Sequence, residues 1–221
     1  MSIYAIGDVH GCFLTLKALF KTAEIKPEDM VVFVGDLVDR GPRIKEVLDF
    51  VFERPNTRIL LGNHDFCFVD WFNPGGHARN EFMLTQGLSQ TLWQLGEDAR
   101  EYAVKLGSKP FVINESSGKY VFCHADYNWA KGESFSASSY GGHIWNRIDA
   151  NSHNDYNGPV IIHGHTPVPL EKAIEQKIDG SVFAINLDGG AVYPQFPFSC
   201  LRALRLDDGK FFEQKSLDFK V

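Results

Sequence analysis

Cysteine is scarce in this chain, and its placement excludes the two structures that cysteines most often build. Among 221 residues there are four cysteines, which lie far apart with no C-x-x-C pair: Cys12, Cys67, Cys123 and Cys200. This spacing argues against a disulfide framework and against a cysteine zinc site. We therefore expect free, buried thiols in a reducing compartment, which makes the cytoplasm the expected location.

Long hydrophobic runs and a surplus of basic residues are also missing. No stretch approaches the roughly 20 apolar residues of a membrane-spanning helix. The first residues show no basic segment followed by a long apolar one, as a signal peptide would. The 22 basic residues are outnumbered by 28 acidic ones, which gives a net charge of −6. Because nucleic-acid backbones and anionic membranes select clustered lysine and arginine, we expect neither as a partner.

A repeated pattern stands out in the first 65 residues. Three short apolar runs are each followed by glycine and potential metal ligands, in segments 7–11 (GDVHG), 35–41 (GDLVDRG) and 62–65 (GNHD). Asp8, Asp36 and Asn63 occupy equivalent points, 28 and 27 residues apart. Helical patterns separate the runs, so we predict parallel strands with right-handed crossovers. The loops after these strands should then meet at one edge of a sheet.

The remainder of the chain changes character after residue 107. Residues 66–107 are predicted to be mostly helical, with a break at Gly75-Gly76. Beyond them, pairs of β-prone runs flank turn sequences and predict three hairpins, within 111–124, 173–187 and 201–215. An α/β first half followed by a strand-rich second half indicates two mixed sheets packed together with helices outside. No segment has the composition of a linker between two domains.

Six side chains at predicted strand ends have the chemistry of metal ligands. Asp8 and His10 are two residues apart in an extended segment and therefore share one side. The alternative for this pair is a turn aspartate and a surface histidine. A carboxylate such as Asp36 can bridge two ions, and the remaining candidates follow other strands: Asn63, His124 and His165. A mixed oxygen and nitrogen set favours manganese, iron or zinc over calcium, and it is large enough for two ions.

A second group of side chains could handle a phosphate. Arg40 precedes a predicted helix, and the planar fork of arginine can bind two phosphate oxygens at once. Arg147 is a second candidate, with a surface ion pair as its alternative. His64 follows a predicted ligand and could donate a proton to a leaving group if a carboxylate fixed its tautomer. Asp39 is the candidate for that carboxylate, and its alternative role is to cap the helix that follows.

Four other histidines and one cysteine receive lesser roles. His163 leaves the same run as His165 and could support the site without binding a metal. Cys12 lies in the first loop, where its oxidation could influence the metal site. Three histidines in polar segments are expected on the surface: His77, His143 and His153.

Six short motifs together resemble the phosphoprotein phosphatase family of metallophosphoesterases, and most of all its small bacterial and bacteriophage-lambda type. They are GDVHG at 7–11, GDLVDRG at 35–41, GNHD at 62–65, CHADY at 123–127, IWNR at 144–147 and GHTP at 164–167. The motifs occur in family order and span most of the chain. The resemblance implies one calcineurin-like domain over residues 1–221, folded as a four-layer α/β/β/α sandwich.

The resemblance also implies a metal centre with divided ligands. A first ion would take Asp8 and His10, and Asp36 would bridge it to a second ion. The second ion would take the remaining candidates: Asn63, His124 and His165. Manganese is the ion that the resemblance favours, with iron and zinc as alternatives.

The implied chemistry is phosphate monoester hydrolysis. A hydroxide between the two ions would attack phosphorus in line, while Arg40 and Arg147 hold the phosphoryl oxygens. His64, held by Asp39, would protonate the leaving oxygen. The expected partner is a phosphorylated protein or peptide carrying phosphoserine or phosphothreonine, with phosphotyrosine as a further substrate class.

One departure from the family pattern leaves the substrate open. Leu61 stands before GNHD, where lambda-type members usually have arginine, and symmetrical diadenosine tetraphosphate hydrolases share this leucine. Those hydrolases resemble GDLVARG in the second motif and lack the acid that Asp39 supplies here, so the balance favours a protein phosphatase. Diadenosine tetraphosphate hydrolysis stays as the alternative. A phosphate-binding module without turnover is a third reading, which the intact set of candidate residues disfavours.

Overall fold

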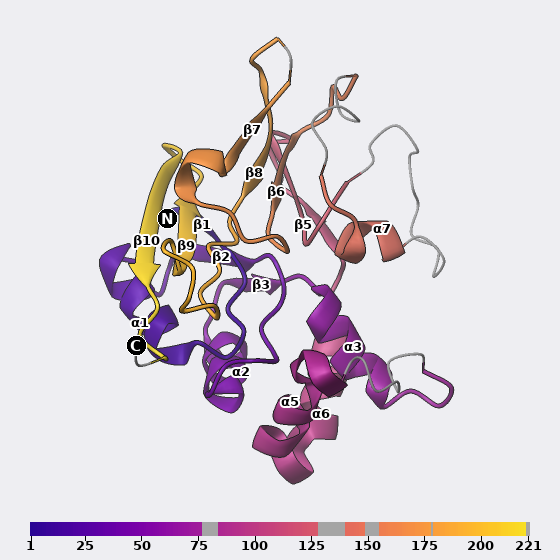
Figure 1. The fold of residues 1–221 in the computed structure, drawn as a ribbon. Helices are drawn as coiled ribbons and strands as arrows, with labels where there is room; N and C mark the ends of the chain where they lie inside the picture. Colours follow the sequence, from indigo (N-terminus) through magenta and orange to yellow (C-terminus); the bar gives the residue numbers. More distant parts are fainter. Residues whose placement is uncertain (77–83, 128–139, 149–154, 178, 220–221) are drawn as a thin grey trace.

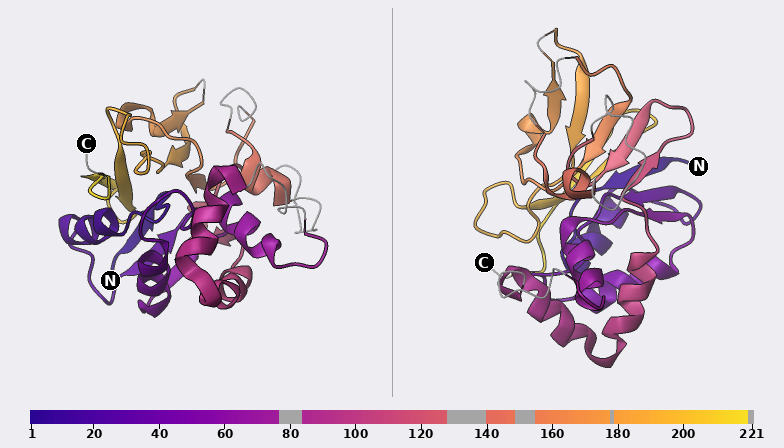
Figure 2. Two further views of the ribbon diagram at one scale, coloured as in Figure 1. Left: turned by 60° about the horizontal axis from the view of Figure 1, so that its bottom comes forward. Right: turned by 90° about the vertical axis from the view of Figure 1, so that its right-hand side faces the viewer.

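The computed structural model describes residues 1–76, 84–127, 140–148, 155–177 and 179–219. Within them, two five-stranded sheets lie against one another, and helices gather on the outer face of the first sheet (Figure 1 and Figure 2). No helix in the described residues has the length and apolar character needed to cross a bilayer.

The first sheet is built around three parallel strands from the amino-terminal part of the chain. Its strand order is β10-β9-β1-β2-β3. The strands are β1 (Ile3–Ile6), β2 (Met30–Phe33), β3 (Thr57–Ile59), β9 (Cys200–Arg205) and β10 (Lys210–Lys215). Strands β1, β2 and β3 run parallel, whereas the β9–β10 hairpin continues the sheet antiparallel to β1. The two ends of the chain therefore contribute to one sheet.

The second sheet also has a parallel centre, here with antiparallel edges. Its strand order is β4-β5-β6-β8-β7. The strands are β4 (Val112–Asn114), β5 (Tyr120–Cys123), β6 (Val160–His163), β7 (Ile174–Gln176) and β8 (Val182–Asn186). Strands β5, β6 and β8 run parallel, and β4 and β7 pair antiparallel at the two edges. Each sheet thus presents three parallel strands whose carboxyl ends can share one site.

The helices follow the crossovers and the middle of the chain. They are α1 (Phe13–Thr22), α2 (Ile44–Glu53), α3 (Asn63–Trp71), α5 (Ser89–Leu95), α6 (Ala99–Gly107) and α7 (Tyr140–Trp145). Single turns of other helix types complete them: η1 (Leu84–Leu88), η2 (Gly96–Asp98) and η5 (Leu170–Lys172). In α2 the residues Ile44, Val47, Leu48 and Val51 are all buried, as their helical spacing predicts.

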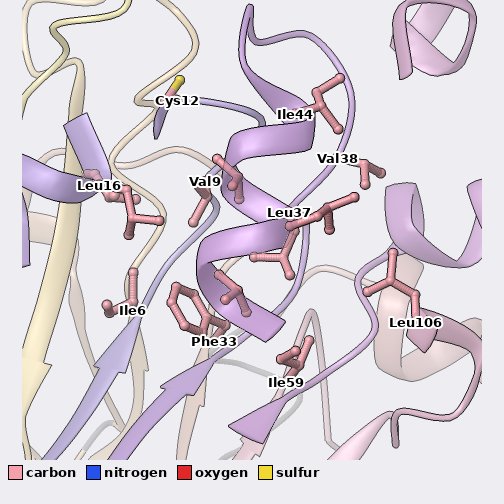
Figure 3. Packing of buried hydrophobic residues seen from close by; sticks show 14 of the residues in the cluster. Ile6, Val9, Cys12, Leu16, Phe33, Leu37, Val38, Ile44, Ile59 and Leu106 are labelled. Atoms are coloured by element: carbon pink, nitrogen blue, oxygen red, sulfur yellow. The ribbon is translucent and has the colours of Figure 1, made fainter. Parts of the chain in front are cut away.

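Alternation along the strands produces two buried layers. Ile6 and Phe33 face the helices, where they pack with Leu16 and Leu37 (Figure 3). The preceding residues of the same strands, Ala5 and Val32, face the other way and pack against the second sheet. Successive strand residues point to opposite faces, so a strand covered on both sides reads as one continuous apolar run. This core fixes the strand ends that carry the site.

The expected sandwich of two mixed sheets with helices is confirmed. The three predicted hairpins are present as β4–β5, β7–β8 and β9–β10. The helical prediction for 66–107 also holds where the structure describes it, although the segment is broken again by Gly87, with φ of 122°, and Gly96, with φ of 53°. Among the described residues, the helix beside the second sheet is the short α7, next to the end of β5 (Figure 1).

Candidate metal centre and phosphate site

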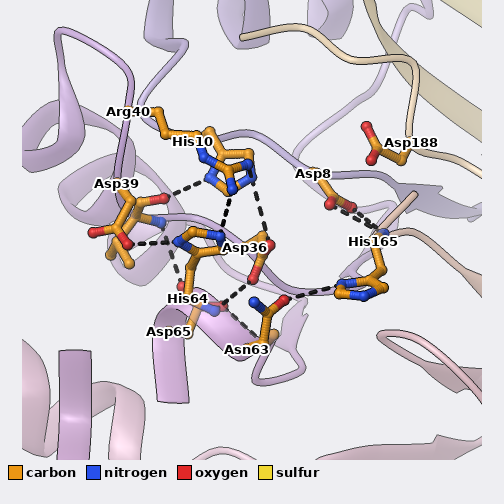
Figure 4. Close-up of polar contacts among 12 residues, drawn as sticks. Asp8, His10, Asp36, Asp39, Arg40, Asn63, His64, Asp65, His165 and Asp188 are labelled. Carbon is orange, nitrogen blue, oxygen red and sulfur yellow. Dashed lines mark hydrogen bonds and ion pairs between the residues drawn. The ribbon is translucent and has the colours of Figure 1, made fainter. Parts of the chain in front are cut away.

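The loops after five parallel strands converge on one buried group of polar side chains. Asp8 follows β1, Asp36 follows β2 and Asn63 is the first residue of α3, just after β3. His124 and His165 arrive from the other sheet, at the ends of β5 and β6. The structure thus brings together all six predicted ligands, including His10, and Figure 4 shows most of them around Asp36. Apart from half-buried His165, each is at most 4% exposed.

Two overlapping sets of these atoms are close enough to hold ions. The ligand atoms of Asp8, Asp36 and His124 lie within 4.8 Å of one another, and so do those of His10, Asp36 and His64. Asp36 belongs to both sets, as a bridging carboxylate must. In one respect the grouping differs from the division of ligands that the resemblance implies, because Asp8 clusters with His124 and not with its loop neighbour His10.

Backbone strain is concentrated in these loops. Left-handed φ values are uncommon for residues other than glycine, yet His10 (43°), Asp36 (53°) and His165 (73°) all adopt them, as do Asp39 (69°) and Arg40 (68°). Each such residue costs on the order of 1 kcal/mol or more, and these conformations persist only where surrounding contacts enforce them. Those contacts include hydrogen bonds from the Val9 and His10 amides to the Asp36 carbonyl, at 3.1 and 2.9 Å.

The tautomers of two histidines are fixed by backbone carbonyls. Nδ1 of His10 donates to the Val38 carbonyl at 2.7 Å, and Nδ1 of His124 donates to the Val34 carbonyl at 3.0 Å. A carbonyl only accepts, so each Nδ1 carries a hydrogen and each Nε2 is the nitrogen turned toward the site. This is the arrangement in which imidazole binds a metal while its other nitrogen is held by the protein.

The atoms in the middle of the site are acceptors that face one another. Nε2 of His124 lies 3.0 Å from Oδ1 of Asn63 and 3.4 Å from Oδ2 of Asp36. Nδ1 of His165 lies 3.1 Å from the same Asn63 oxygen. Lone pairs gathered in this way need a proton or a cation between them. The donor set of carboxylate, amide and imidazole therefore fits divalent transition-metal ions.

The pKa shifts of the buried groups also indicate a site that takes up a cation. Burial by itself lowers the pKa of His124, but the charges of Asp36 and Asp8 outweigh it and raise this pKa to about 10. Burial, together with the charges of Asp188 and Asp36, raises the pKa of Asp8 well above its usual range. Burial and the neighbouring His124 lower the pKa of His165 to about 4. Protons on His124 and Asp8 therefore compete with a metal ion for this site.

Two glycines are required because each packs directly on a ligand. A Cβ at Gly62 would lie 2.0 Å from Oδ1 of Asp36, and a Cβ at Gly164 would lie 2.0 Å from Oδ1 of Asp8. Both distances are far inside van der Waals contact. Glycine in GNHD and in GHTP thus leaves room for the carboxylates of the other loops.

His64 and Asp39 form a buried pair beside the ligands. Nδ1 of His64 donates to Oδ2 of Asp39 at 2.6 Å, and both side chains are at most 5% exposed. The hydroxyl of Thr91 donates to the other Asp39 oxygen and accepts from the Asp39 amide at 3.0 Å. The alternative reading of Asp39 as a helix cap is wrong, because α2 begins at Ile44 without a side-chain cap.

The two predicted phosphate-binding arginines line one cavity of about 310 Å³ with the ligands. Arg40 donates to Nε2 of His10 at 2.9 Å and to Nε2 of His64 at 2.7 Å, and its guanidinium lies over the ring of Tyr193 at 5.4 Å. Arg147 is exposed at the cavity and makes no hydrogen bond or ion pair with any other described residue. The alternative prediction, that Arg147 forms a surface ion pair, is therefore not met among the described residues.

Sequence reasoning missed two buried carboxylates. Asp65 accepts hydrogen bonds from the amides of Leu37, Val38 and Gly62, and so ties the second loop to the third. Burial and the charge of Asp36 raise its pKa to about 6. Asp188 follows β8, lines the cavity, and accepts from the Gly190 amide at 2.9 Å. Burial raises the pKa of Asp188 to about 6 as well, against the effect of that amide.

The two remaining histidines that the structure describes, His143 and His163, bond groups other than the predicted ligands. His143 is buried, contrary to the prediction, because Nδ1 donates to the Asp126 carbonyl at 2.9 Å and its ring contacts Tyr127. His163 turns from the site and pairs with Glu175 through Nε2 at 3.1 Å. His77 and His153 lie outside the described residues.

The cysteines are free and buried, as expected. Burial raises the pKa of every one of these thiols. The thiolate is the reactive form of cysteine, so the predicted redox influence of Cys12 finds no support in an activated thiol. It stays a prediction.

Comparison with known proteins places this geometry in a family. The family model described as calcineurin-like phosphoesterase matches residues 1–205. A protein from Erwinia tasmaniensis named symmetrical bis(5'-nucleosyl)-tetraphosphatase is 35% identical over 127 residues, which are 57% of this chain and 44% of that protein. A Pectobacterium carotovorum protein of the same name is 37% identical over 57% of this chain and 43% of its own length. This chain thus matches less than half of each of these relatives.

Solved structures with the same fold carry several different titles. One titled a putative diadenosine tetraphosphatase has a TM-score of 0.70 at 19% identity, covering 98% of this chain and 94% of its own. A cold-active protein-tyrosine phosphatase from Shewanella has a TM-score of 0.64 at 16% identity, covering 97% and 80%. A serine/threonine phosphatase from Saccharomyces cerevisiae has a TM-score of 0.66 at 13% identity, covering 100% and 81%. At these identities the likeness concerns the fold alone, and with the family match it shows that the chain belongs to the calcineurin-like phosphoesterases.

Proposed function

We propose that this metallophosphoesterase hydrolyses phosphate monoesters on proteins, with phosphoserine and phosphothreonine as substrates. The observation that carries the proposal is the buried pair of His64 and Asp39, whose atoms are 2.6 Å apart beside the ligands. Nδ1 of His64 is committed to Asp39, so Nε2, which accepts from Arg40 in this structure, is the nitrogen that would carry the proton to be donated. A histidine held in this way can pass a proton to a leaving oxygen.

The residues around Asp36 would hold two divalent ions, with Asp36 shared between them. The other ligands would be Asp8, His10, Asn63, His124 and His165, a set that suits manganese, iron or zinc. When bound, the ions supply Lewis-acid stabilisation and an acidified water. We propose manganese as the activating ion.

The protein's own groups position the substrate. The guanidinium of Arg40 lines the cavity, and the two nitrogens that donate to His10 and His64 in this structure would donate to two oxygens of a bound phosphoryl group. Arg147 offers a second cation from the exposed side of the same cavity. Together they would neutralise the charge on the phosphoryl oxygens and orient phosphorus for in-line attack.

The need for an acid depends on the leaving group. A serine or threonine alkoxide is a very strong base and leaves slowly unless it is protonated. The phosphate group that departs from an anhydride is a weak base and needs no such help. A carboxylate-held histidine is therefore most useful to an enzyme that cleaves a monoester of an alcohol, and this favours a phosphoprotein substrate.

Symmetrical dinucleoside tetraphosphate hydrolysis is the second candidate, and sequence similarity favours it over the first. The curated relatives at 35–37% identity carry that activity in their names. Leu61, which suggested this substrate, does not add to the case. It is 3% exposed and packs in the apolar core beneath the first sheet.

One experiment separates the candidates. Purified protein would be assayed with manganese, iron and zinc against a phosphoserine peptide and against diadenosine tetraphosphate, beside the variant His64→Asn. We expect turnover of the peptide that falls at least about 100-fold in the variant, since general acids contribute roughly 10²–10⁴-fold. Turnover of the dinucleotide alone would overturn the first candidate in favour of the second. A protein inactive with every ion and substrate would support the reading as a binding module.

A further inference from the structure

A second cavity adjoins the catalytic one. It also measures about 310 Å³ and lies on the side of the second sheet, between the loop after β6 and the edge strand β7. Arg147 and His165 line both cavities, so the two meet at these side chains. The charged side chains that line the second cavity are Arg147, Lys172 and Glu175, and His163 lines it beside Glu175. A substrate whose phosphate reaches Arg147 would bring its neighbouring groups to this cavity.

Two cations of this cavity have no ion-pair partner among the residues that the structure describes. Oε1 of Glu175 lies 3.1 Å from Nε2 of His163, so this carboxylate already has a partner in the cavity. Lys172 is exposed, and its side chain has no hydrogen bond or ion pair with the rest of the described chain. The same holds for Arg147. Two cations that no described residue neutralises, within one concave surface, attract an anionic group, although the protein as a whole has a net charge of −6.

We propose that this second cavity is a subsite for another anionic group of the substrate, beside the phosphate that is cleaved. Lys172 is the specificity-determining residue, and Arg147 links the subsite to the catalytic cavity. This inference rests on the proposed function and adds a substrate preference to it. The preferred phosphoprotein carries aspartate or glutamate next to the phosphorylated residue. A polyphosphate chain offers the same chemistry, since its next phosphate is also an anion.

The test compares two phosphoserine peptides that differ in the flanking residues, aspartate in one and asparagine in the other. With the wild-type enzyme we expect a lower KM for the acidic peptide. Lys172→Ala should raise that KM about fivefold, the size of one solvent-exposed ion pair, and leave kcat and the asparagine peptide within twofold. Lys172→Glu should make the asparagine peptide the better substrate. The preference of the wild type should also shrink as salt is added.

Lys177→Ala is the matched control. Lys177 follows β7 and is not part of the cavity lining. Its replacement by alanine removes the same charge beside the same sheet. It should leave the ratio of the two KM values unchanged. Equal ratios in the wild type, Lys172→Ala and Lys177→Ala would overturn the subsite.

Failure of the proposed function is a separate result. If the enzyme cleaves diadenosine tetraphosphate and neither peptide, the function proposal falls, and the subsite is then tested on that dinucleotide. Lys172→Ala should still raise its KM about fivefold, and an unchanged KM would contradict the subsite. If neither the peptides nor the dinucleotide is hydrolysed, the ratio of the Kd values of the two peptides replaces the ratio of their KM values. A ratio that Lys172→Ala leaves unchanged would contradict the subsite.

Discussion

Replacing Asp39 by asparagine should separate proton donation from every other function of the site. The carboxylate accepts from His64 through Oδ2 at 2.6 Å and from the hydroxyl of Thr91 through Oδ1. Asparagine keeps one acceptor for His64, and the Thr91 hydroxyl can turn to accept from the new amide. The orientation of His64 is therefore preserved, while the negative charge that stabilises its protonated form is lost.

The decrease in kcat that we expect for Asp39→Asn depends on the leaving group. General acid catalysis contributes roughly 10²–10⁴-fold, which corresponds to about 2.7–5.4 kcal/mol at 1.36 kcal/mol per tenfold change in rate. Asp39→Asn should lose this factor in kcat on a phosphoserine peptide. On p-nitrophenyl phosphate, whose leaving group needs little protonation, the loss should stay below tenfold.

The assay is steady-state kinetics on both substrates with saturating manganese, together with metal content by elemental analysis. Both ions should be retained, because Asp39 is not among the predicted ligands. Equal losses on the two substrates would refute the reasoning, since they would show that Asp39 maintains the site as a whole. The control is Thr91→Val, which removes both hydrogen bonds between the Thr91 hydroxyl and Asp39 but keeps the negative charge, and it should cost less than Asp39→Asn on the peptide.

The remaining predictions concern the metal and phosphate sites. Gly164→Ala places a Cβ 2.0 Å from Oδ1 of Asp8, so manganese affinity should fall at least about tenfold in a calorimetric titration; unaltered affinity would mean that the loop simply moves. Arg147→Ala should raise KM for phosphate monoesters, and an unchanged kcat/KM would return Arg147 to a surface role. Because the pKa of His124 is raised to about 10, this ligand is protonated at pH 7 in the metal-free protein and must lose that proton to bind. Manganese affinity should therefore rise with pH up to about 10, and the measured enthalpy of manganese binding should depend on the buffer that takes up the released proton. A pH-independent affinity would contradict this protonation of His124.

Much of the fold and site could be predicted because the loops repeat one local pattern. Asp8, Asp36 and Asn63 each follow a buried strand beside glycine, and parallel strands bring such loops to one edge. The pairing of His64 with Asp39 could be proposed from two neighbouring motifs. The structure places these residues together, although their roles in catalysis stay predictions.

Other parts of the site depend on contacts that no local pattern records. Thr91 lies 52 residues from Asp39, inside a helix whose sequence has no motif. Asp188 repeats the pattern of an apolar run followed by aspartate and glycine, and that signal could have found it. Asp65 stands two residues after the helix start and accepts from the Gly62 amide, a capping arrangement that GNHD could have suggested.

His143 shows why exposure is hard to predict from composition alone. Its surroundings in the sequence are polar and glycine-rich, and yet the packing of α7 beside Tyr127 buries it. The second cavity is a similar case, because Arg147 and Lys172 are 25 residues apart in the sequence and line the same cavity only in the folded chain.

Anomalous diffraction from crystals grown with manganese is the most direct test of the central idea. We predict two peaks in one pocket, with Asp36 bound to both and His165 bound to one of them. A single peak, or two ions with no shared Asp36 oxygen, would contradict a shared two-metal centre.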